Sequence, residues 1–244
     1  MGRLVCKAVV LLLLSPAAAL AVDGWVSDPR TGCRLWLLNV QPGHSVTWDG
    51  SCAGGYASGR GRFTVLLNGV RTSQGEADFL NGKRNGRGFV ITPDGGRTEG
   101  EYADGKLNGR VIMMWPDGQR YDGQMRNNLR EGHGVLVSAN GDRYDGEWKA
   151  NQADGLGIYT WKDGRRYEGE WKAGLSDGRG KMSWPNGTWY EGEWRKDRPN
   201  GQGVYHGPAV SGVTGNWSGP WRDGCYSMNG SKAAITRTNA ECGF

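Results

Sequence analysis

The chain has 244 residues, with 43 glycines, 12 tryptophans and only 4 phenylalanines, a composition that is unusual for a close-packed globular domain. Its formal net charge is +5 at pH 7, from 30 basic and 25 acidic residues. Because these charges are interspersed rather than gathered into a basic patch or stripe, the composition gives little support for binding to nucleic acid.

The segment 1–21 has the pattern of a cleavable secretory signal. Two basic residues precede an apolar run from Ala8 to Leu14, and the small-residue site Ala19-Leu20-Ala21 follows. The alternative is an uncleaved membrane anchor, but a spanning helix needs about 20 apolar residues, and Pro16 interrupts this stretch. We therefore expect a mature chain that begins at Val22 and is periplasmic or secreted.

From Trp48 onward the chain repeats itself. With the tyrosine of YEGEW as position 1, similar segments begin every 23 residues, at Tyr121, Tyr144, Tyr167 and Tyr190. Weaker copies begin at Gly75, Thr98 and Val213, and an earlier copy begins at Trp48, at a wider interval from the next. A fixed period of this length indicates a repeat architecture. The array spans residues 48–217, as about seven full copies and one partial copy, between an N-terminal flank, 22–47, and a C-terminal flank, 218–244.

Each copy is predicted to form a two-stranded β-hairpin, which gives an all-β fold. Alternate side chains of a strand share a face, so Tyr167, Gly169 and Trp171 point one way, while Glu168 and Glu170 point into water. Asp-Gly and Asn-Gly pairs in the second half of the copies favour tight turns. A glycine beside large rings allows an aromatic side chain to lie against the backbone.

Stacked copies place equal positions in columns, and the apolar columns are the predicted core. The predicted core residues are Tyr121, Tyr144, Tyr167 and Tyr190 at position 1, Trp148, Trp171, Trp194 and Trp217 at position 5, and Phe63, Val90, Met113, Leu136, Tyr159, Met182 and Tyr205 at position 16. A lone hairpin is marginal in water, so several must pack in series and the two ends need caps. The flanks 22–47 and 218–244 are expected to form those caps.

Four cysteines remain after removal of the signal, namely Cys33, Cys52, Cys225 and Cys242. They allow three pairings. Stacked hairpins gain about 10 Å per two strands, so pairs across the array would lie tens of Å apart. The Cα atoms of a disulfide must lie within about 7 Å. We expect Cys33 to pair with Cys52 and Cys225 with Cys242; a zinc site is the alternative, although neither pair has the CxxC spacing of zinc ligands.

The residues offer little for catalysis. Glu168 and Glu170 recur at equivalent exposed positions along the array, whereas a catalytic acid and base need different environments in one site. The three histidines, His44, His133 and His206, are scattered, so neither a metal centre nor a serine–histidine arrangement is expected. We expect a protein that is not an enzyme and has no cofactor.

Position 23 forms a column of arginines on the same face as the acidic residues. The column consists of Arg97, Arg120, Arg143 and Arg166. The simpler interpretation is a solvated ladder of alternating charge, in which each pair contributes little. The alternative is that the column meets a phosphate or an acidic partner.

The segment YEGEWKAGLSDGRG at residues 167–180, with its tyrosine-x-glycine-x-tryptophan start and later glycine-x-glycine, resembles the MORN (membrane occupation and recognition nexus) repeat. The resemblance covers the whole array, 48–217. Some copies depart from it: Thr98, Gly75 and Val213 lack the first aromatic residue, Val111 replaces a glycine, and Cys52 stands at the tryptophan position. The resemblance implies an elongated, twisted antiparallel sheet of hairpins that serves protein or lipid interaction rather than catalysis.

These observations predict a non-enzymatic scaffold that binds a protein of the cell envelope, with Trp189 and Trp221 as exposed anchors and the arginine column at the rim. The alternative is peripheral binding to anionic lipid through the same arginines. The mature chain has 28 basic and 25 acidic residues, a net charge of only +3, and the acids beside the arginines weigh against the lipid alternative. A dimer formed through an exposed sheet edge is left open.

Overall fold

A computed structural model describes residues 22–208, 214–228 and 231–243. The predicted signal sequence and Val213 fall outside these residues. The described chain contains strands and no helix. The strands are β1 (Val22–Ser27), β2 (Arg34–Val40), β3 (His44–Trp48), β4 (Ser51–Ala53), β5 (Tyr56–Leu67), β6 (Val70–Leu80), β7 (Lys83–Ile91), β8 (Arg97–Ala103), β9 (Lys106–Met114), β10 (Arg120–Arg126), β11 (Leu129–Val137), β12 (Arg143–Lys149), β13 (Gln152–Thr160), β14 (Arg166–Lys172), β15 (Leu175–Ser183), β16 (Trp189–Arg195), β17 (Arg198–Pro208), β18 (Thr214–Trp221), β19 (Cys225–Met228) and β20 (Ser231–Ala234).

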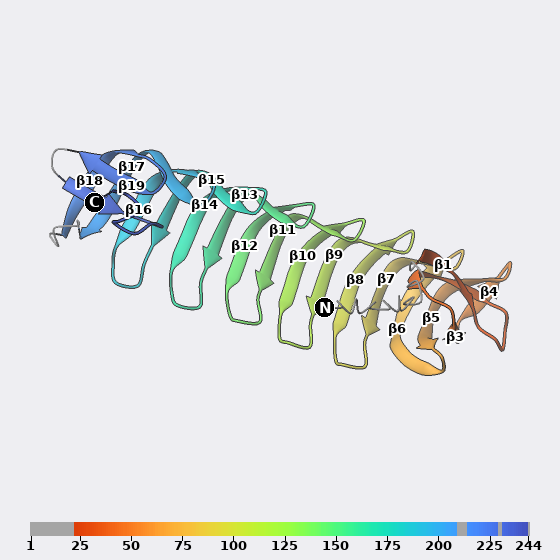
Figure 1. Cartoon of the computed structure of the whole chain (residues 1–244). Coiled ribbons are helices and arrows are strands. Elements are labelled where there is room, and N and C mark those ends of the chain that lie inside the picture. The colour runs from red at the N-terminus through yellow and green to blue at the C-terminus, as the bar shows by residue number, and fades with distance from the viewer. Residues whose placement is uncertain (1–21, 209–213, 229–230, 244) are drawn as a thin grey trace, which may run out of the picture.

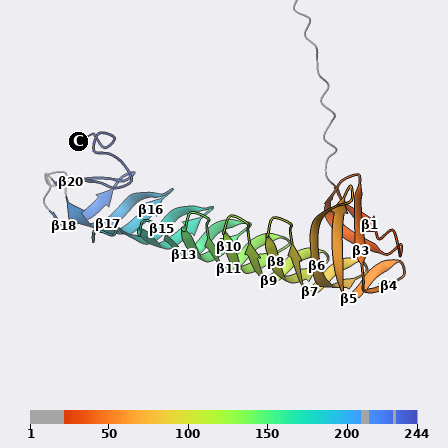
Figure 2. The same ribbon diagram turned by 90° about the horizontal axis from the view of Figure 1, so that it is seen from below.

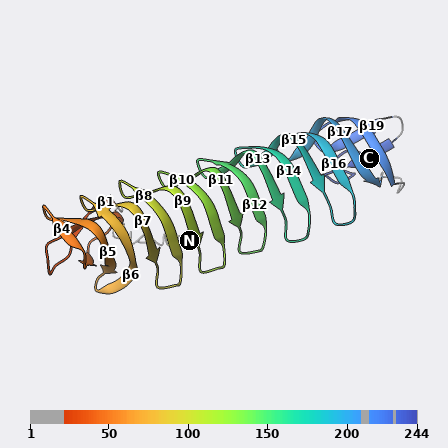
Figure 3. The ribbon, with the colours of Figure 1, turned by 180° about the vertical axis from the view of Figure 1, so that it is seen from behind.

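One sheet of 18 strands runs the length of the molecule, and β19 and β20 form a separate two-stranded sheet. Pairing in the long sheet is antiparallel, apart from a single parallel bridge between β2 and β5. The strands lie across the long axis, which makes an extended, twisted ribbon (Figure 1). Turns follow one another along both long edges (Figure 3). The predicted fold class, an elongated and twisted antiparallel sheet of hairpins, is confirmed.

The internal hairpins pair in one common register. In β14 and β15, Tyr167 lies opposite Met182 and Trp171 lies opposite Ser176, with a β-bulge between Gly169 and Trp171. The same bulge occurs between positions 3 and 5 in the hairpins that start with β6, β8, β10, β12 and β16. A bulge bends its strand and increases its twist. Because every internal hairpin carries this bulge, the bend is repeated along the whole array.

The columns at positions 1 and 5 form the core on one face of the sheet, which we call the aromatic face. The four tyrosines at position 1 are at most 3% exposed. The ring of Tyr167 contacts those of Trp171 and Trp194 edge to face, at centroid distances of 5.1 and 5.2 Å. The predicted core is thus confirmed for these columns, with Trp171 only partly buried. Trp217 is also partly buried, but the pairing of its strand places it at position 1 rather than at position 5. At position 16, Phe63, Met182 and Tyr205 are buried, and the other members are partly buried.

The glycines of the repeat face these rings. Gly169 pairs with Gly180 across the hairpin, and a methyl group added at Gly180 would overlap the ring of Tyr167. The Tyr167 hydroxyl donates a hydrogen bond to the carbonyl oxygen of Glu170 at 3.0 Å. A side chain at Gly180 would therefore displace the tyrosine, and one at Gly169 would overlap the backbone of Arg179 and Gly180 as well, which explains why glycine and tyrosine recur together.

The two flanking segments cover the ends of the aromatic face. Val26 and Leu35, from β1 and β2, belong to one buried cluster with Trp48 of the first hairpin. At the other end Ile235, which follows β20, belongs to a buried cluster with Trp221. Both flanks rise from the same side of the ribbon (Figure 2). The buried cluster in the central part of the aromatic face contains no residue of either flank.

A disulfide ties each flank, and the predicted cysteine pairing is confirmed. Cys33 is bonded to Cys52 with a Cα–Cα distance of 5.8 Å. Cys225 is bonded to Cys242 with a Cα–Cα distance of 5.6 Å. Both distances are within the range that a disulfide requires.

The last copy starts at Trp217, and its assignment to Val213 was wrong. Trp221 lies opposite Gly201, as Trp194 lies opposite Gly178 in the preceding copy. Strand β17 has 11 residues whereas β15 has 9, so the next copy starts later in the sequence than the regular period predicts. The tyrosine-x-glycine-x-tryptophan pattern therefore corresponds to WSGPW at 217–221, which follows Tyr190 at a wider interval than the internal period.

Backbone hydrogen bonds between successive turns also support this register. In the internal copies the turn residue at position 8 donates its N–H to the position-10 carbonyl of the preceding copy, as Asn151 does to Arg130 at 3.1 Å. Asp197 makes the same bond to Ser176 at 3.0 Å. Gly224 makes it to Pro199 at 2.8 Å, which is the bond expected if position 1 is Trp217.

Candidate interaction surface

The face opposite the aromatic face, which we call the charged face, alternates apolar strands with ion-paired strands from β7 to β14. The apolar side chains that strands β7, β9, β11 and β13 present are Phe89 and Ile91, Ile112 and Met114, Val135 and Val137, and Ile158. Strands β8, β10, β12 and β14 present Arg97 and Glu99, Arg120 and Asp122, Arg143 and Asp145, and Arg166 and Glu168. The period of this alternation is two strands, or about 10 Å.

Each arginine of the position-23 column has a carboxylate partner two residues further along its own strand. The nitrogen–oxygen distances are 2.7 Å for Arg97–Glu99, 2.8 Å for Arg120–Asp122, 2.6 Å for Arg143–Asp145 and 2.6 Å for Arg166–Glu168. These are partly to fully exposed pairs, each of which contributes little to stability. Their positive charge is offset locally, so the column is a ladder of ion pairs rather than a row of free cations.

Glu168 and Glu170 have separate structural roles. The Glu168 carboxylate pairs with Arg166, while the Glu170 carboxylate accepts a hydrogen bond from the backbone N–H of Arg179 at 2.8 Å. Glu193 accepts the equivalent bond from the N–H of Gln202 at 3.2 Å. The position-4 carboxylates therefore satisfy a backbone donor of the neighbouring strand.

Exposed apolar side chains and shallow hollows lie on the charged face. Met114 is 42% exposed and Leu156 is 62% exposed. A hollow of about 610 Å³ has Asp122 and Val135 among its lining residues. Another, of about 400 Å³, has Phe89 among them. The sequence reasoning missed these apolar residues, although position 15 carried the signal: it is apolar in most copies and faces the same way as the acids.

Trp189 lies on the charged face at position 23 and is partly buried. Its ring stacks on that of His206, with centroids 5.7 Å apart and an interplanar angle of 14°. The Lys181 ammonium lies 4.7 Å from the Trp189 ring centroid. The indole is therefore covered on part of its surface by neighbours, and the arginines of the column continue the same row.

Trp221 is not an exposed anchor, and that prediction was wrong. Its side chain is 2% exposed, and its ring lies 5.1 Å from those of both Tyr190 and Tyr226. The physical reason is the shifted last copy, because Trp221 occupies position 5, which belongs to the core column. The structure therefore separates Trp221 from Trp189 and the arginines, which remain together on the charged face.

The described residues contain no group of three or more histidine, cysteine or acidic side chains arranged to hold a metal ion. The histidines are apart: His133 pairs with Asp145 at 3.0 Å, and His206 contacts Asn216 at 2.8 Å. Within the part of the chain that the structure describes, we find no helix with the length and apolar character needed to span a membrane.

Comparison with protein-family models matches the MORN repeat in six consecutive segments, residues 76–97, 99–120, 121–143, 144–165, 167–189 and 190–209, which together cover more than half of the chain. The chain belongs to the MORN repeat family. The copy at Trp48 and the one at Trp217 lie outside these six MORN segments, and each is separated from its neighbouring copy by more than the regular period. A search of curated protein sequences finds no match to this MORN protein.

Among solved structures, the MORN chain is similar to the TCP domain of Drosophila melanogaster SAS-4 (dCPAP), which was solved in complex with a proline-rich motif of Ana2 (dSTIL). The two are 13% identical, the match covers 80% of this chain and 99% of that chain, and the TM-score is 0.35. The TCP10 domain of Danio rerio CPAP is 12% identical, with 75% and 98% of the two chains covered and a TM-score of 0.25.

Proposed function

We propose that this MORN protein is a non-enzymatic scaffold of the cell envelope, and that it binds a protein partner through the charged face of its array. The observation that carries the proposal is the alternation of apolar side chains that are partly or fully exposed with ion pairs from β7 to β14. Protein interfaces combine apolar contact area with polar groups, and arginine is enriched in them. The repeat provides the same contacts in several successive hairpins, which suits an extended partner.

Anionic lipid is the weaker candidate for the same face. Attraction to an anionic membrane contributes about 1 kcal/mol per basic residue near the surface, provided that neighbouring acids do not offset the charge. Each arginine of the position-23 column has a carboxylate within 2.8 Å. The apolar side chains between these pairs, such as Leu156, favour a protein surface that can pack against them.

An envelope location is part of the proposal. It is supported by the signal-like residues 1–21 and by one disulfide at each end of the array, since disulfides persist in oxidising compartments. Amino-terminal sequencing of the protein from the periplasm or medium should give Val22 as the first residue. Recovery of the intact amino terminus on a membrane-bound product would contradict export by cleavage.

A photo-cross-linking amino acid at Met114 tests the partner surface in intact cells. We expect one reproducible protein adduct, and we expect it to disappear in Leu156→Arg, which places a charge among the apolar side chains of the charged face. The matched control is Leu129→Arg, because Leu129 is 41% exposed but starts strand β11 at a turn on the edge of the sheet. Loss of the adduct in both variants would refute the assignment of the surface. Salt-sensitive binding of the purified protein to anionic vesicles, without an adduct, would favour lipid instead.

A further inference from the structure

A hollow of about 420 Å³ lies on the aromatic face, where the C-terminal flank meets the array. Its apolar floor consists of Trp161, Tyr167, Trp171, Met182 and Trp194. Trp161 and Trp171 are only partly buried, so their rings offer apolar surface to a ligand. Thr236 of the flank contributes to the lining. The volume is in the range of about 300 to 1,000 Å³ that is typical of small-molecule sites.

Three basic side chains line the rim of the hollow. Arg165 and Arg198 line it, and each pairs with a carboxylate, Asp163 and Asp223 respectively. Lys196 also lines it, and its ammonium group has no carboxylate within 4.0 Å among the described residues.

The one carboxylate among the lining residues, Asp197, has no ion-pair contact with Lys196. Asp197 directs an oxygen to Ser176, from which it accepts the backbone N–H at 2.7 Å and the hydroxyl at 3.1 Å. Lys196 is therefore the rim cation available to an incoming anion.

We propose that this hollow binds an apolar carboxylate, with the apolar group on the tryptophan floor and the carboxylate at Lys196. Burial of the apolar group removes its surface, and that of the floor, from water. The Lys196 ammonium would then gain the charged partner that it lacks. Aromatic floors also attract quaternary ammonium groups, but the Lys196 ammonium, which has no carboxylate within 4.0 Å among the described residues, repels such ligands. Two sources carry the proposed chemistry: a free acid, and the C-terminal residue of a peptide.

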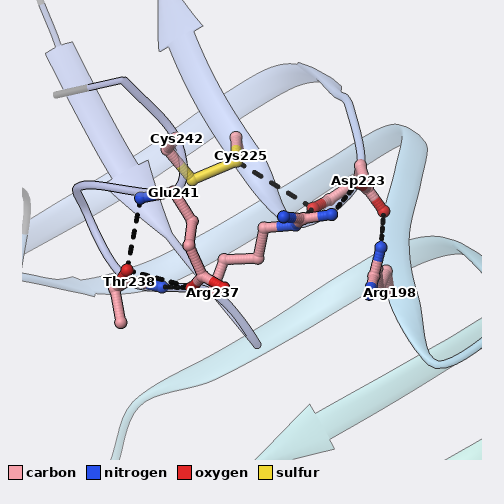
Figure 4. Close-up of a disulfide and its surroundings, with 7 residues drawn as sticks. All are labelled: Arg198, Asp223, Cys225, Arg237, Thr238, Glu241 and Cys242. Atoms are coloured by element: carbon pink, nitrogen blue, oxygen red, sulfur yellow. Dashed lines mark hydrogen bonds and ion pairs between the residues drawn. A yellow bond between two sulfur atoms is a disulfide. The ribbon is translucent and has the colours of Figure 1, made fainter.

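The wall of the hollow belongs to the flank that the second disulfide holds. Figure 4 shows Arg237, next to Thr236, directed at Asp223, to which it is ion-paired, and close to the Cys225–Cys242 disulfide. The Arg237 Nε also donates a hydrogen bond to the Asp223 carbonyl oxygen at 3.0 Å. Asp223 is thus shared by Arg237 and by Arg198 on the rim, which fixes the wall relative to the array.

The array itself provides a variant that should fold normally. Lys196 occupies a turn with φ of 49°, and the two preceding copies have Ala150 and Ala173 at the same turn position, with φ of 48° and 50°. Lys196→Ala therefore introduces a residue that this turn already accepts. Lys149→Ala is the matched control, because Lys149 is an exposed lysine that does not line the hollow and its loss gives the same change in net charge.

The test is a calorimetric titration of the full chain with phenylbutyrate and with phenylbutanol, which has a hydroxyl in place of the carboxylate. We expect the wild type to bind phenylbutyrate, Lys196→Ala to weaken that binding about tenfold, and phenylbutanol binding to change less than twofold, since a hydrogen bond to a charged group is lost only for the acid. Lys149→Ala should change neither. Absence of phenylbutyrate binding to the wild type, or an equal loss for acid and alcohol, would overturn the proposal.

Two further titrations identify the source and the sign of the ligand. A short peptide that ends in phenylalanine with a free carboxylate should bind more tightly than its amide. If the peptide also binds more tightly than phenylbutyrate, the ligand is a peptide C-terminus; otherwise the ligand is a free acid. Tetramethylammonium should not bind. Binding of tetramethylammonium in preference to phenylbutyrate would show that the floor accepts cations and would contradict the proposed site. The hollow lies on the face opposite to the proposed partner surface, so each proposal can fail independently.

Discussion

Replacement of Trp194 by alanine tests whether the tryptophan column holds successive hairpins together. The side chain is 5% exposed, and its ring meets those of Tyr167 and Tyr190 edge to face at 5.2 and 5.3 Å. Its indole N–H donates to the Gly180 carbonyl oxygen at 3.0 Å. Truncation of a buried tryptophan costs about 3 to 5 kcal/mol. Edge-to-face ring pairs contribute about 0.5 to 1.5 kcal/mol each, so the two pairs account for a substantial part of the expected loss.

The assay is urea unfolding followed by circular dichroism, with Glu191→Ala as the control in the same strand. Glu191 is 61% exposed and pairs with Lys181 at 3.3 Å, a surface contact worth less than about 1 kcal/mol. Trp171→Ala should cost about 2 to 4 kcal/mol, at the lower end for a tryptophan, because Trp171 is only partly buried. If Trp194→Ala costs no more than Glu191→Ala, the hairpins are held by backbone pairing and the aromatic column does not have the role assigned to it.

Three further predictions concern packing and ionisation. Gly180→Ala adds a methyl group that overlaps the ring of Tyr167, so thermal unfolding should show a loss of about 1 to 3 kcal/mol. The hydrogen bond and charge of Arg198 hold the pKa of the Asp223 carboxyl below its usual 3.8. This carboxylate therefore stabilises the folded state above pH 3.8, and the stabilisation is lost as the pH falls through the lower pKa of the folded state. The wild type should lose more stability in acid than Asp223→Asn. Burial raises the pKa of Tyr121 from 10.0 to about 12. The protonated tyrosine therefore stabilises the folded state below pH 10, and this stabilisation is lost as the pH rises through about 12. Tyrosinate absorbance should appear at higher pH in the folded protein than in urea.

The fold and its core were predictable because the same residue pattern recurs in successive copies, so each copy is subject to the same physical constraints. Tyr167, Gly169 and Trp171 share a face in any extended strand, and the glycine opposite the ring, Gly180, can be recognised once copies are aligned. The disulfides followed from the same geometry, since only cysteines at the same end of the array lie close enough to pair, as Cys33 and Cys52 do. Periodicity therefore fixed the faces, the columns and the cysteine pairing.

The candidate site was less predictable, because it depends on departures from the period. Strand β17, with 11 residues, is longer than β15, with 9, which moves position 5 to Trp221 and buries a side chain expected at the surface. The hollow beside Lys196 needs Thr236, which is brought to the array by a flank with no repeat pattern. Tertiary placement of such a flank cannot be read from the spacing of residues in the array.

The spacing of the copies has a consequence for how proteins of this design vary in length. The intervals from Trp48 to Gly75 and from Tyr190 to Trp217 are equally wide, while every step between these two end intervals is the shorter regular period. An internal hairpin presents the same bulge and turn to both of its neighbours, so one period can be inserted or deleted without altering what either disulfide-bonded flank contacts. Each such unit changes the length of the ribbon by about 10 Å. Duplication or deletion of the gene segment that encodes one period thus changes the distance between the two ends by one fixed increment.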